Sequence, residues 1–574
     1  MSTRNSEADC AVNPYTRSAD FKPPPRGIWA TLRQLGPGMI LVGGIVGSGE
    51  LIMTTKLGAV AGFGLLWFVL LSCLIKVVVQ AELTRHTISS GQTFLTVFND
   101  LPGPAGPRPV WLTLPWMAAV LVASTVALAV YIQLPAAWRT GRVAGVFTGA
   151  VAATTILAGW MISLSRSKSL TKKVSKTFEA PAIISNHSLQ QNSRHLFHPE
   201  NNRPNVNWFT WLWLASMLII FVNSAAILGG AGQTIEMALP GWFGNGGSVV
   251  WAVIIGAVAA ALLLSGTYSV LEKTLITLVA SFTLLTVIST ILLQWTGFAV
   301  TWADLRYGVS MSLPAEMSTT VTLTALAMFA GTGVAYGEMW NYTYWCVEKG
   351  YARNIGESQP GTEWPRRARG WIRVMYTDVL LTMVFYTVST VCFYILGCAI
   401  LFAKQLDPDG LQTISVLSSA YTESLGSWAA TLFVVGAFFV LFTTVLAGAA
   451  GMSRLMADVL GVIGIIDWKD YQARLRFIRI FVVVFLAMCG IAYWLFQNPP
   501  KMLTVTSTLI GALFYPIMGL GVLYLRHCKV DRRITPGKLT TVWLWICCIS
   551  LTVISPGGIL LALAIEYGWL PIHT

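Results

Sequence analysis

Charged side chains are scarce in this chain of 574 residues. They make up 11% of the sequence, whereas 55% of the residues are hydrophobic and the mean hydropathy is +0.64. Because soluble domains carry about 25% charged residues, this composition excludes an ordinary soluble enzyme and a disordered chain. The 38 Lys and Arg outnumber the 25 Asp and Glu. They stand between long apolar runs and form no basic domain, which indicates membrane topology and excludes nucleic acid as the expected partner.

Several catalytic and metal-binding signatures are also absent. The nine cysteines include no C-x-x-C pair, and most lie in apolar runs, where a cysteine is usually a small buried hydrophobe. No H-E-x-x-H, G-x-S-x-G or Walker A pattern occurs, so we expect neither an enzyme nor a nucleotide-driven pump, and no resident cofactor. Residues 1–35 hold no apolar core followed by a cleavage site. We therefore expect them to form a polar cytoplasmic tail and not a signal peptide.

Long apolar runs make up most of the remaining sequence. A membrane-spanning helix needs about 20 largely apolar residues, and we expect an all-α polytopic membrane protein with about 13 such spans and the lipid bilayer as its surroundings. The predicted transmembrane domain covers residues 36–565, and residues 566–574 follow it. The predicted spans are 36–56, 63–80, 111–134, 143–164, 209–232, 249–264, 275–295, 321–345, 379–402, 428–451, 480–496, 502–525 and 542–565.

The positive charges predict how the chain is oriented in the membrane. If the N-terminus is cytoplasmic, 30 of the 38 Lys and Arg fall in segments on the inside and 5 in segments outside. Since cytoplasmic loops carry the excess of Lys and Arg, we expect the polar loop 166–207 inside and residues 566–574 outside. This pattern fits a multi-pass protein of the bacterial inner (plasma) membrane. Three irregularly spaced histidines in the 166–207 loop favour a linker over a metal sensor.

Two of the apolar spans are interrupted by glycine and contain a carboxylate. Residues 43–52 read GGIVGSGELI and residues 331–340 read GTGVAYGEMW. Both contain V-x-x-G-E, which ends at Glu50 and at Glu338, 288 residues apart. Glycine costs about 1 kcal/mol relative to alanine in a helix interior, so we predict that both helices are broken. Matched broken helices in two halves of a chain indicate a midplane binding site of a transporter with inverted repeats.

The chemistry of such a site favours a cation. Unwound backbone is tolerated at membrane depth where it lines a cavity, and there its carbonyl groups are free to coordinate an ion. Two carboxylates and backbone oxygens suit a hard divalent cation such as Mg²⁺ or Mn²⁺. The predicted ligand set combines two side-chain carboxylates, two carbonyl groups and a hydroxyl, from Glu50, Glu338, Val46, Gly47 and Ser48.

The same acids also have a structural interpretation. Glu50 and Glu338 would then cap the broken helices or pair with a buried Lys56 or Lys273. Downstream of the second interruption, Asn341 either lines a pathway or packs in the interior. The residue pattern leaves these alternatives open.

The segment from Gly36-Pro37-Gly38 to residue 67 resembles the opening segment of the NRAMP-type divalent metal transporters, in the LeuT-like (APC) superfamily. The sequence YWCVEKGY at 344–351 is similar to a divergent branch of that family. The resemblance implies a LeuT-like inverted repeat (5+5), with broken first and sixth core helices and an inserted helix pair at 111–164. It also implies secondary active transport of a divalent metal cation by alternating access, as a proton symporter.

The sequence departs from the family pattern at the site itself. The family motif Asp-Pro-Gly-Asn aligns with residues 47–50, so its aspartate is replaced by Gly47 and its asparagine by Glu50. The family pattern Ala-x-x-Met-Pro-His is missing, with Met339 nearby, and the loss of that thioether would permit harder ions. Two alternatives follow. One is a LeuT-like transporter of an amino acid or organic cation, and the other is a non-transporting membrane receptor or scaffold that uses the 166–207 loop.

Overall fold

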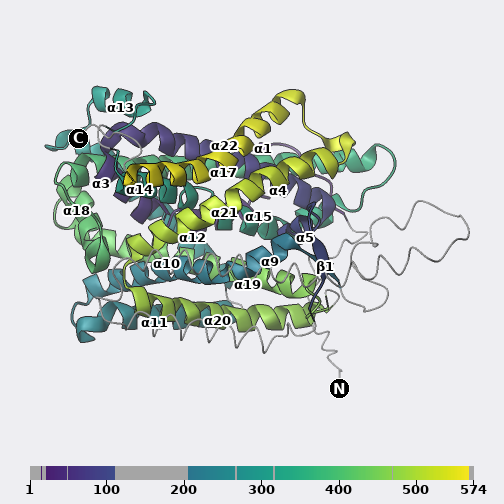
Figure 1. The fold of residues 1–574 in the computed structure, drawn as a ribbon, viewed down its shortest axis with the longest axis horizontal. Helices are drawn as coiled ribbons and strands as arrows, with labels where there is room; N and C mark the ends of the chain where they lie inside the picture. Colours follow the sequence, from purple (N-terminus) through teal and green to yellow (C-terminus); the bar gives the residue numbers. More distant parts are fainter. Residues whose placement is uncertain are drawn as a thin grey trace, which may run out of the picture.

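The described part of the protein is built almost entirely from helices (Figure 1). The structure, a computed structural model, describes residues 15, 21–47, 49–109, 204–265, 268–314, 317–467 and 470–567. The two predicted spans at 111–134 and 143–164, and most of the predicted 166–207 loop, lie outside these residues. Strands β1 (Ala105–Pro107) and β2 (Asn205–Asn207) pair antiparallel on either side of that gap. The two described segments that flank residues 110–203 in the sequence therefore lie side by side.

The helices of the first half follow one another with few breaks. They are α1 (Ile28–Leu32), α2 (Pro37–Ile45), η1 (Gly49–Thr54), α3 (Thr55–Ala61), η2 (Gly62–Leu65), α4 (Leu66–Ser90), α5 (Phe94–Asn99), α9 (Trp208–Ala215), α10 (Met217–Ala238), η4 (Gly244–Gly246), α11 (Gly247–Ser265), α12 (Tyr268–Leu292) and η5 (Leu293–Trp295).

The second half begins with a short helix and then contributes the longest ones. Its elements are α13 (Trp302–Val309), α14 (Thr319–Gly331), α15 (Tyr336–Glu348), α16 (Tyr351–Ile355), α17 (Glu363–Leu396), η6 (Gly397–Phe402), η7 (Gly410–Gln412), α18 (Thr413–Leu425), α19 (Ala429–Val462), α20 (Tyr471–Phe496), α21 (Pro499–Cys528), η8 (Arg532–Ile534) and α22 (Lys538–Glu566).

The predicted all-α membrane architecture is confirmed. Each predicted span outside 111–164 coincides with one helix or with a broken helix, and in the described residues nine helical runs are long and apolar enough to cross a membrane. The total of 13 remains a prediction, because two of the spans lie outside the described residues. Helices also exceed the apolar runs: α17 begins at Glu363 although its predicted span begins at 379, because a helix can continue into the polar region beyond the hydrocarbon.

Both predicted helix breaks are present. In the first predicted span, α2 ends at Ile45 and η1 begins at Gly49, and in the eighth, α14 ends at Gly331 and α15 begins at Tyr336. Equivalent helices of the two halves pack against each other, α4 on α17, α10 on α19 and α11 on α20. In Figure 1, α10, α11, α19 and α20 occupy the lower part of the view, and α4, α17, α21 and α22 occupy the upper part.

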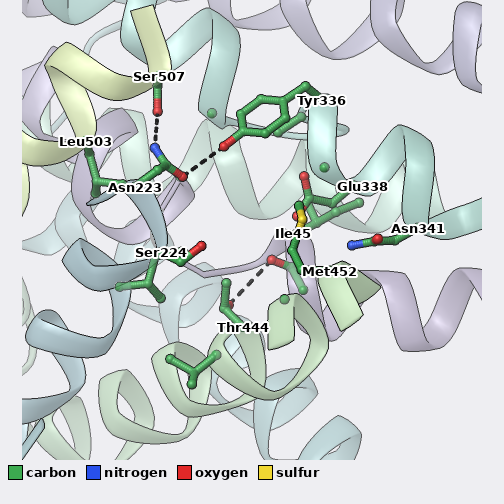
Figure 2. A pocket seen from close by; sticks show the side chains of 18 of the residues that line it. Ile45, Asn223, Ser224, Tyr336, Glu338, Asn341, Thr444, Met452, Leu503 and Ser507 are labelled. Carbon is green, nitrogen blue, oxygen red and sulfur yellow. Dashed lines mark hydrogen bonds between the residues drawn. The ribbon is translucent and has the colours of Figure 1, made fainter. Parts of the chain in front are cut away.

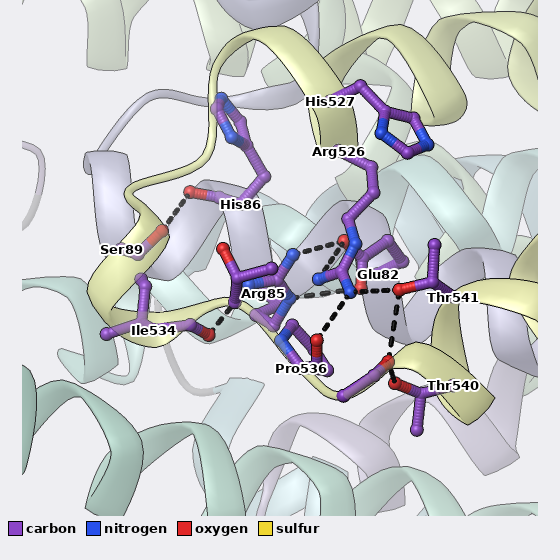
Figure 3. A network of polar contacts seen from close by, with 12 residues as sticks. Glu82, Arg85, His86, Ser89, Arg526, His527, Ile534, Pro536, Thr540 and Thr541 are labelled. Carbon is purple, nitrogen blue, oxygen red and sulfur yellow. Dashed lines mark hydrogen bonds and ion pairs between the residues drawn. The ribbon is translucent and has the colours of Figure 1, made fainter.

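A network of charged side chains fastens the C-terminal half of α4 to the turn between α21 and α22 (Figure 3). Glu82 accepts hydrogen bonds from Arg85, one of them to Nε at 3.0 Å, and lies 3.6 Å from Arg526 Nη1. Arg85 also donates to the Ile534 carbonyl, and Arg526 to the Pro536 carbonyl. The Glu82 carboxylate offsets one of the two guanidinium charges, and the Ile534 and Pro536 carbonyl oxygens supply further acceptors, because an uncompensated buried charge is strongly unfavourable.

The two breaks touch each other backbone to backbone. A Cβ atom added at Gly49 would lie 2.1 Å from the carbonyl oxygen of Gly331, at the end of α14. No side chain fits at this distance, so the sequence needs glycine at position 49 for close approach of the two chains. The two breaks can therefore cross this closely only because residue 49 has no side chain.

We predict that Gly49→Ala destabilises the protein by about 1–3 kcal/mol, because the added methyl group must displace backbone. The control is Gly557→Ala, since a Cβ there meets nothing within 4 Å and alanine is the better helix former. Thermal unfolding of the purified variants in detergent measures both. Equal midpoints for Gly49→Ala and wild type would contradict the close approach.

Candidate functional site

A cavity lies between the two helix breaks and the helices α10, α19, α20 and α21 (Figure 2). Gly49 and Gly333 border it from the first and second break. Its polar side chains come from four helices, α10, α15, α19 and α21: they are those of Asn223, Ser224, Tyr336, Glu338, Asn341, Thr444 and Ser507. The two helix breaks thus meet beside a cavity.

Glu338 is the carboxylate of this cavity. It lies in the first turn of α15, half-buried, near the positive end of that helix dipole. One turn further along α15, Asn341 is buried and its Oδ1 atom has no hydrogen-bond partner in the described part of the chain. The thioether of Met452 borders the same space, since a Cβ at Gly337 would lie 3.8 Å from its methyl carbon. A carboxylate, an amide and a thioether thus belong to residues that line one cavity.

The side-chain amide of Asn223 forms hydrogen bonds within the opposite wall of the cavity. Its amide group donates to Thr506 Oγ1 at 2.8 Å and to Ser507 Oγ at 2.9 Å, and its Oδ1 accepts from Tyr336 Oη at 3.0 Å. The dashed lines in Figure 2 show the bonds to Ser507 and Tyr336. Asn223 therefore joins α10 to α15 and α21. The unpartnered Asn341 is the amide with an oxygen to offer a ligand.

Glu50 occupies a different position from Glu338. It is fully buried, and its Oε1 accepts from the Gly333 N–H at 2.7 Å while its Oε2 accepts from the Gly47 N–H at 3.3 Å. It does not border the cavity, although its neighbour Gly49 does. Glu50 thus clamps the two breaks together, as in the capping alternative that the sequence left open.

The remaining predicted ligands lie beside this clamp. Val46 and Gly47 are buried at the end of α2 and do not border the cavity, and Ser48 lies outside the described residues. Among the described residues no group of three or more His, Cys, Asp and Glu is placed to hold a metal ion. A ligand set for an ion would therefore depend on neutral oxygen and sulfur atoms as well as on carboxylates.

Lys56 does not pair with either acid. Its Nζ forms an ion pair with Asp407 at 3.0 Å and donates to the Pro408 carbonyl at 3.1 Å. The side chain of Lys273 lies outside the described residues. The carboxylate of Glu338 thus keeps its place on the cavity without a lysine partner from α3.

The profile of the Nramp family, described as natural resistance-associated macrophage protein-like, matches residues 182–560. This chain belongs to the Nramp family. The predicted family is thereby confirmed, and with it the predicted class of function, a metal-ion transporter and not an enzyme. No curated protein matches the chain in sequence.

Solved structures show the same architecture. A manganese transporter of Eremococcus coleocola, in complex with an aromatic bis-isothiourea substituted compound, is 11% identical over 97% of this chain and 92% of that chain, with a TM-score of 0.55. A mutant of that transporter is 12% identical over the same shares, with a TM-score of 0.56. The predicted LeuT-like fold is confirmed.

Sequence reasoning did not select three residues that the structure brings to this region. Met452 and Asn223 lie in unbroken apolar helices, where no glycine or acid marks them. Lys76 lies within the predicted span 63–80. A buried lysine in an apolar run is itself a signal, because intramembrane ionisable groups are costly and usually functional.

We predict that Glu50→Gln destabilises the protein by about 1.5–3 kcal/mol, because the amide nitrogen faces a backbone N–H where the carboxylate accepted a hydrogen bond. The matched control is Glu566→Gln at the exposed end of α22, where the carboxylate accepts from Thr319 Oγ1. Thermal unfolding in detergent measures both variants without metal. A stability loss no greater than in the control would show that Glu50 is not a clamp.

Proposed function

We propose that this Nramp protein moves a divalent cation, Mn²⁺ or Mg²⁺, across the membrane by alternating access, with Glu338 as the carboxylate that binds the ion. The observation that supports this most is that Glu338 and Asn341 line one cavity between the broken helices, and that the buried Asn341 oxygen has no partner among the described residues. A buried polar atom without a partner is unfavourable unless a ligand or water meets it. A metal ion satisfies both groups at once.

The donor set suits transport better than storage. Carboxylate, amide and hydroxyl oxygens from Glu338, Asn341 and Ser224 are ligands for hard cations. With one carboxylate on the cavity, an ion is held weakly enough to leave again, as conduction and transport require. The manganese transporter of similar fold supports the choice of a divalent ion.

The predicted ligands of the first break remain part of the proposal. Alternating access moves the broken helices relative to the rest, as one repeat rocks against the other. Such a shift would expose Glu50, the carbonyls of Val46 and Gly47, and Ser48 to the cavity that Gly49 already borders. The cytoplasmic N-terminus, the external C-terminus, the bacterial inner membrane and the proton coupling are likewise proposed, on the distribution of positive charges and on the family.

We predict that Glu338→Gln lowers the uptake of Mn²⁺ and Mg²⁺ into proteoliposomes at least tenfold, because the neutral amide loses the charge that attracts the ion. Glu566→Gln is the control, and uptake with and without a pH gradient tests proton coupling. Thermal stability of Glu338→Gln should equal that of wild type, because no clamp is lost. Wild-type protein that takes up no divalent ion, or that takes up an amino acid or an organic cation instead, would overturn the proposal.

The thioether at the cavity gives a second prediction, on ion preference. Soft sulfur ligands favour soft ions over Mg²⁺, so Met452→Leu should lower Cd²⁺ uptake several-fold and leave Mg²⁺ uptake within about twofold. Met339→Leu is the control, because Met339 is fully buried and does not border the cavity. Equal losses for both ions would show that Met452 only packs.

A further inference from the structure

Lys76 is a fully buried lysine that contacts the second break from the side. It lies within α4, and its Nζ donates to the Phe329 carbonyl at 2.7 Å and, in a short contact, to the Thr332 carbonyl. The same Nζ lies 5.4 Å from the centre of the Phe329 ring. Two backbone oxygens and an aromatic ring therefore surround this ammonium group.

The carbonyl groups that Lys76 contacts are left over by the break. The last carbonyls of a helix have no partner within it, and the Gly333 N–H that would reach Phe329 donates to Glu50 Oε1. An unpaired carbonyl inside the membrane costs several kcal/mol. The C-terminal end of α14 is also the negative end of its dipole, which favours a cation.

The acids that act electrostatically on Lys76 are those of the candidate site. They are Glu50 and Glu338, while Cys73 is the titratable group on its own helix. Paired carbonyl oxygens beside carboxylates form the surroundings that a monovalent metal cation requires. The ammonium group of Lys76 fills such surroundings permanently, because it is tied to α4.

We propose that the Lys76 ammonium group is a tethered monovalent cation, which occupies a cation site formed by the Phe329 and Thr332 carbonyls beside Glu50 and Glu338. It replaces a free Na⁺ or K⁺ that the break would otherwise need, so that the transporter binds its divalent ion without a monovalent partner. Lys76 is a positioning residue, because it acts on the cavity through the end of α14 and through its charge. The site itself does not depend on the proposed function, but the effect on divalent binding rests on it.

Lys76→Ala tests the site directly, because it empties the space and leaves the two carbonyl groups. We expect Na⁺, K⁺ or ammonium to raise the unfolding midpoint of this variant by about 2–4 °C over an equal concentration of choline, which is too large to enter. Wild type should show no such difference. The control is Lys56→Ala, since Lys56 is buried as well but pairs with Asp407. A folded Lys76→Ala that responds to none of these cations overturns the proposal.

Lys76→Gln keeps the test decisive if Lys76→Ala does not fold, because the Gln amide still donates to carbonyl groups but carries no charge. Removing a positive charge near Glu338 should tighten Mn²⁺ binding roughly threefold or more, as measured by calorimetry. A purely structural lysine would leave the affinity unchanged or weaken it, and either result overturns the proposal. If wild type binds no divalent ion, the proposed function fails, and the response of Lys76→Ala to Na⁺ still decides the fate of the cation site.

Discussion

The constraint on which this structure depends is that backbone N–H and C=O groups must find partners inside the membrane. Two helices are broken at membrane depth, and each break releases groups that an unbroken helix would have paired. In the second break, Glu50 takes the Gly333 N–H, Lys76 takes the Phe329 carbonyl and Tyr515 Oη donates to the Ala330 carbonyl at 2.8 Å. Side chains from η1, α4 and α21 thus supply the hydrogen-bond partners that a continuous helix would have supplied.

Each partner matches the group that it satisfies: an acceptor meets N–H groups, and a donor meets carbonyl groups. The carboxyl oxygens of Glu50 accept from N–H groups, and the Lys76 Nζ donates to carbonyl groups at the negative end of α14. The hydroxyl groups of Thr54 and Thr332 meet the Gly49 carbonyl between them. Glu50 and Lys76 are engaged in these bonds, whereas Glu338 is the acid that borders the cavity.

Long apolar runs and glycine-rich interruptions were sufficient to predict a helical membrane protein with two broken helices, because each has a direct physical meaning, and the family resemblance added the LeuT-like arrangement. Both breaks appear where glycine clusters predicted them. The roles of the two acids could not be separated in the same way, since both follow the same V-x-x-G-E pattern. What separates them is the crossing of the breaks, which gives Glu50 the Gly333 N–H and gives Glu338 a place on the cavity. Such a contact joins residues 283 positions apart and leaves no local trace in the sequence.

The hydrogen bonds that close the breaks also indicate how a broken helix can move without unfolding. The bonds that close the breaks run between elements, from Glu50 to the second break and from Thr444 of α19 to the Gly44 carbonyl at 3.4 Å. A relative shift of α2, η1, α14 and α15 exchanges these side-chain partners and leaves the bonds within each half-helix intact. Exchanging a few hydrogen-bond partners costs less free energy than breaking a continuous helix in lipid. In the proposed transport cycle, the breaks that border the candidate site therefore also serve as its hinges.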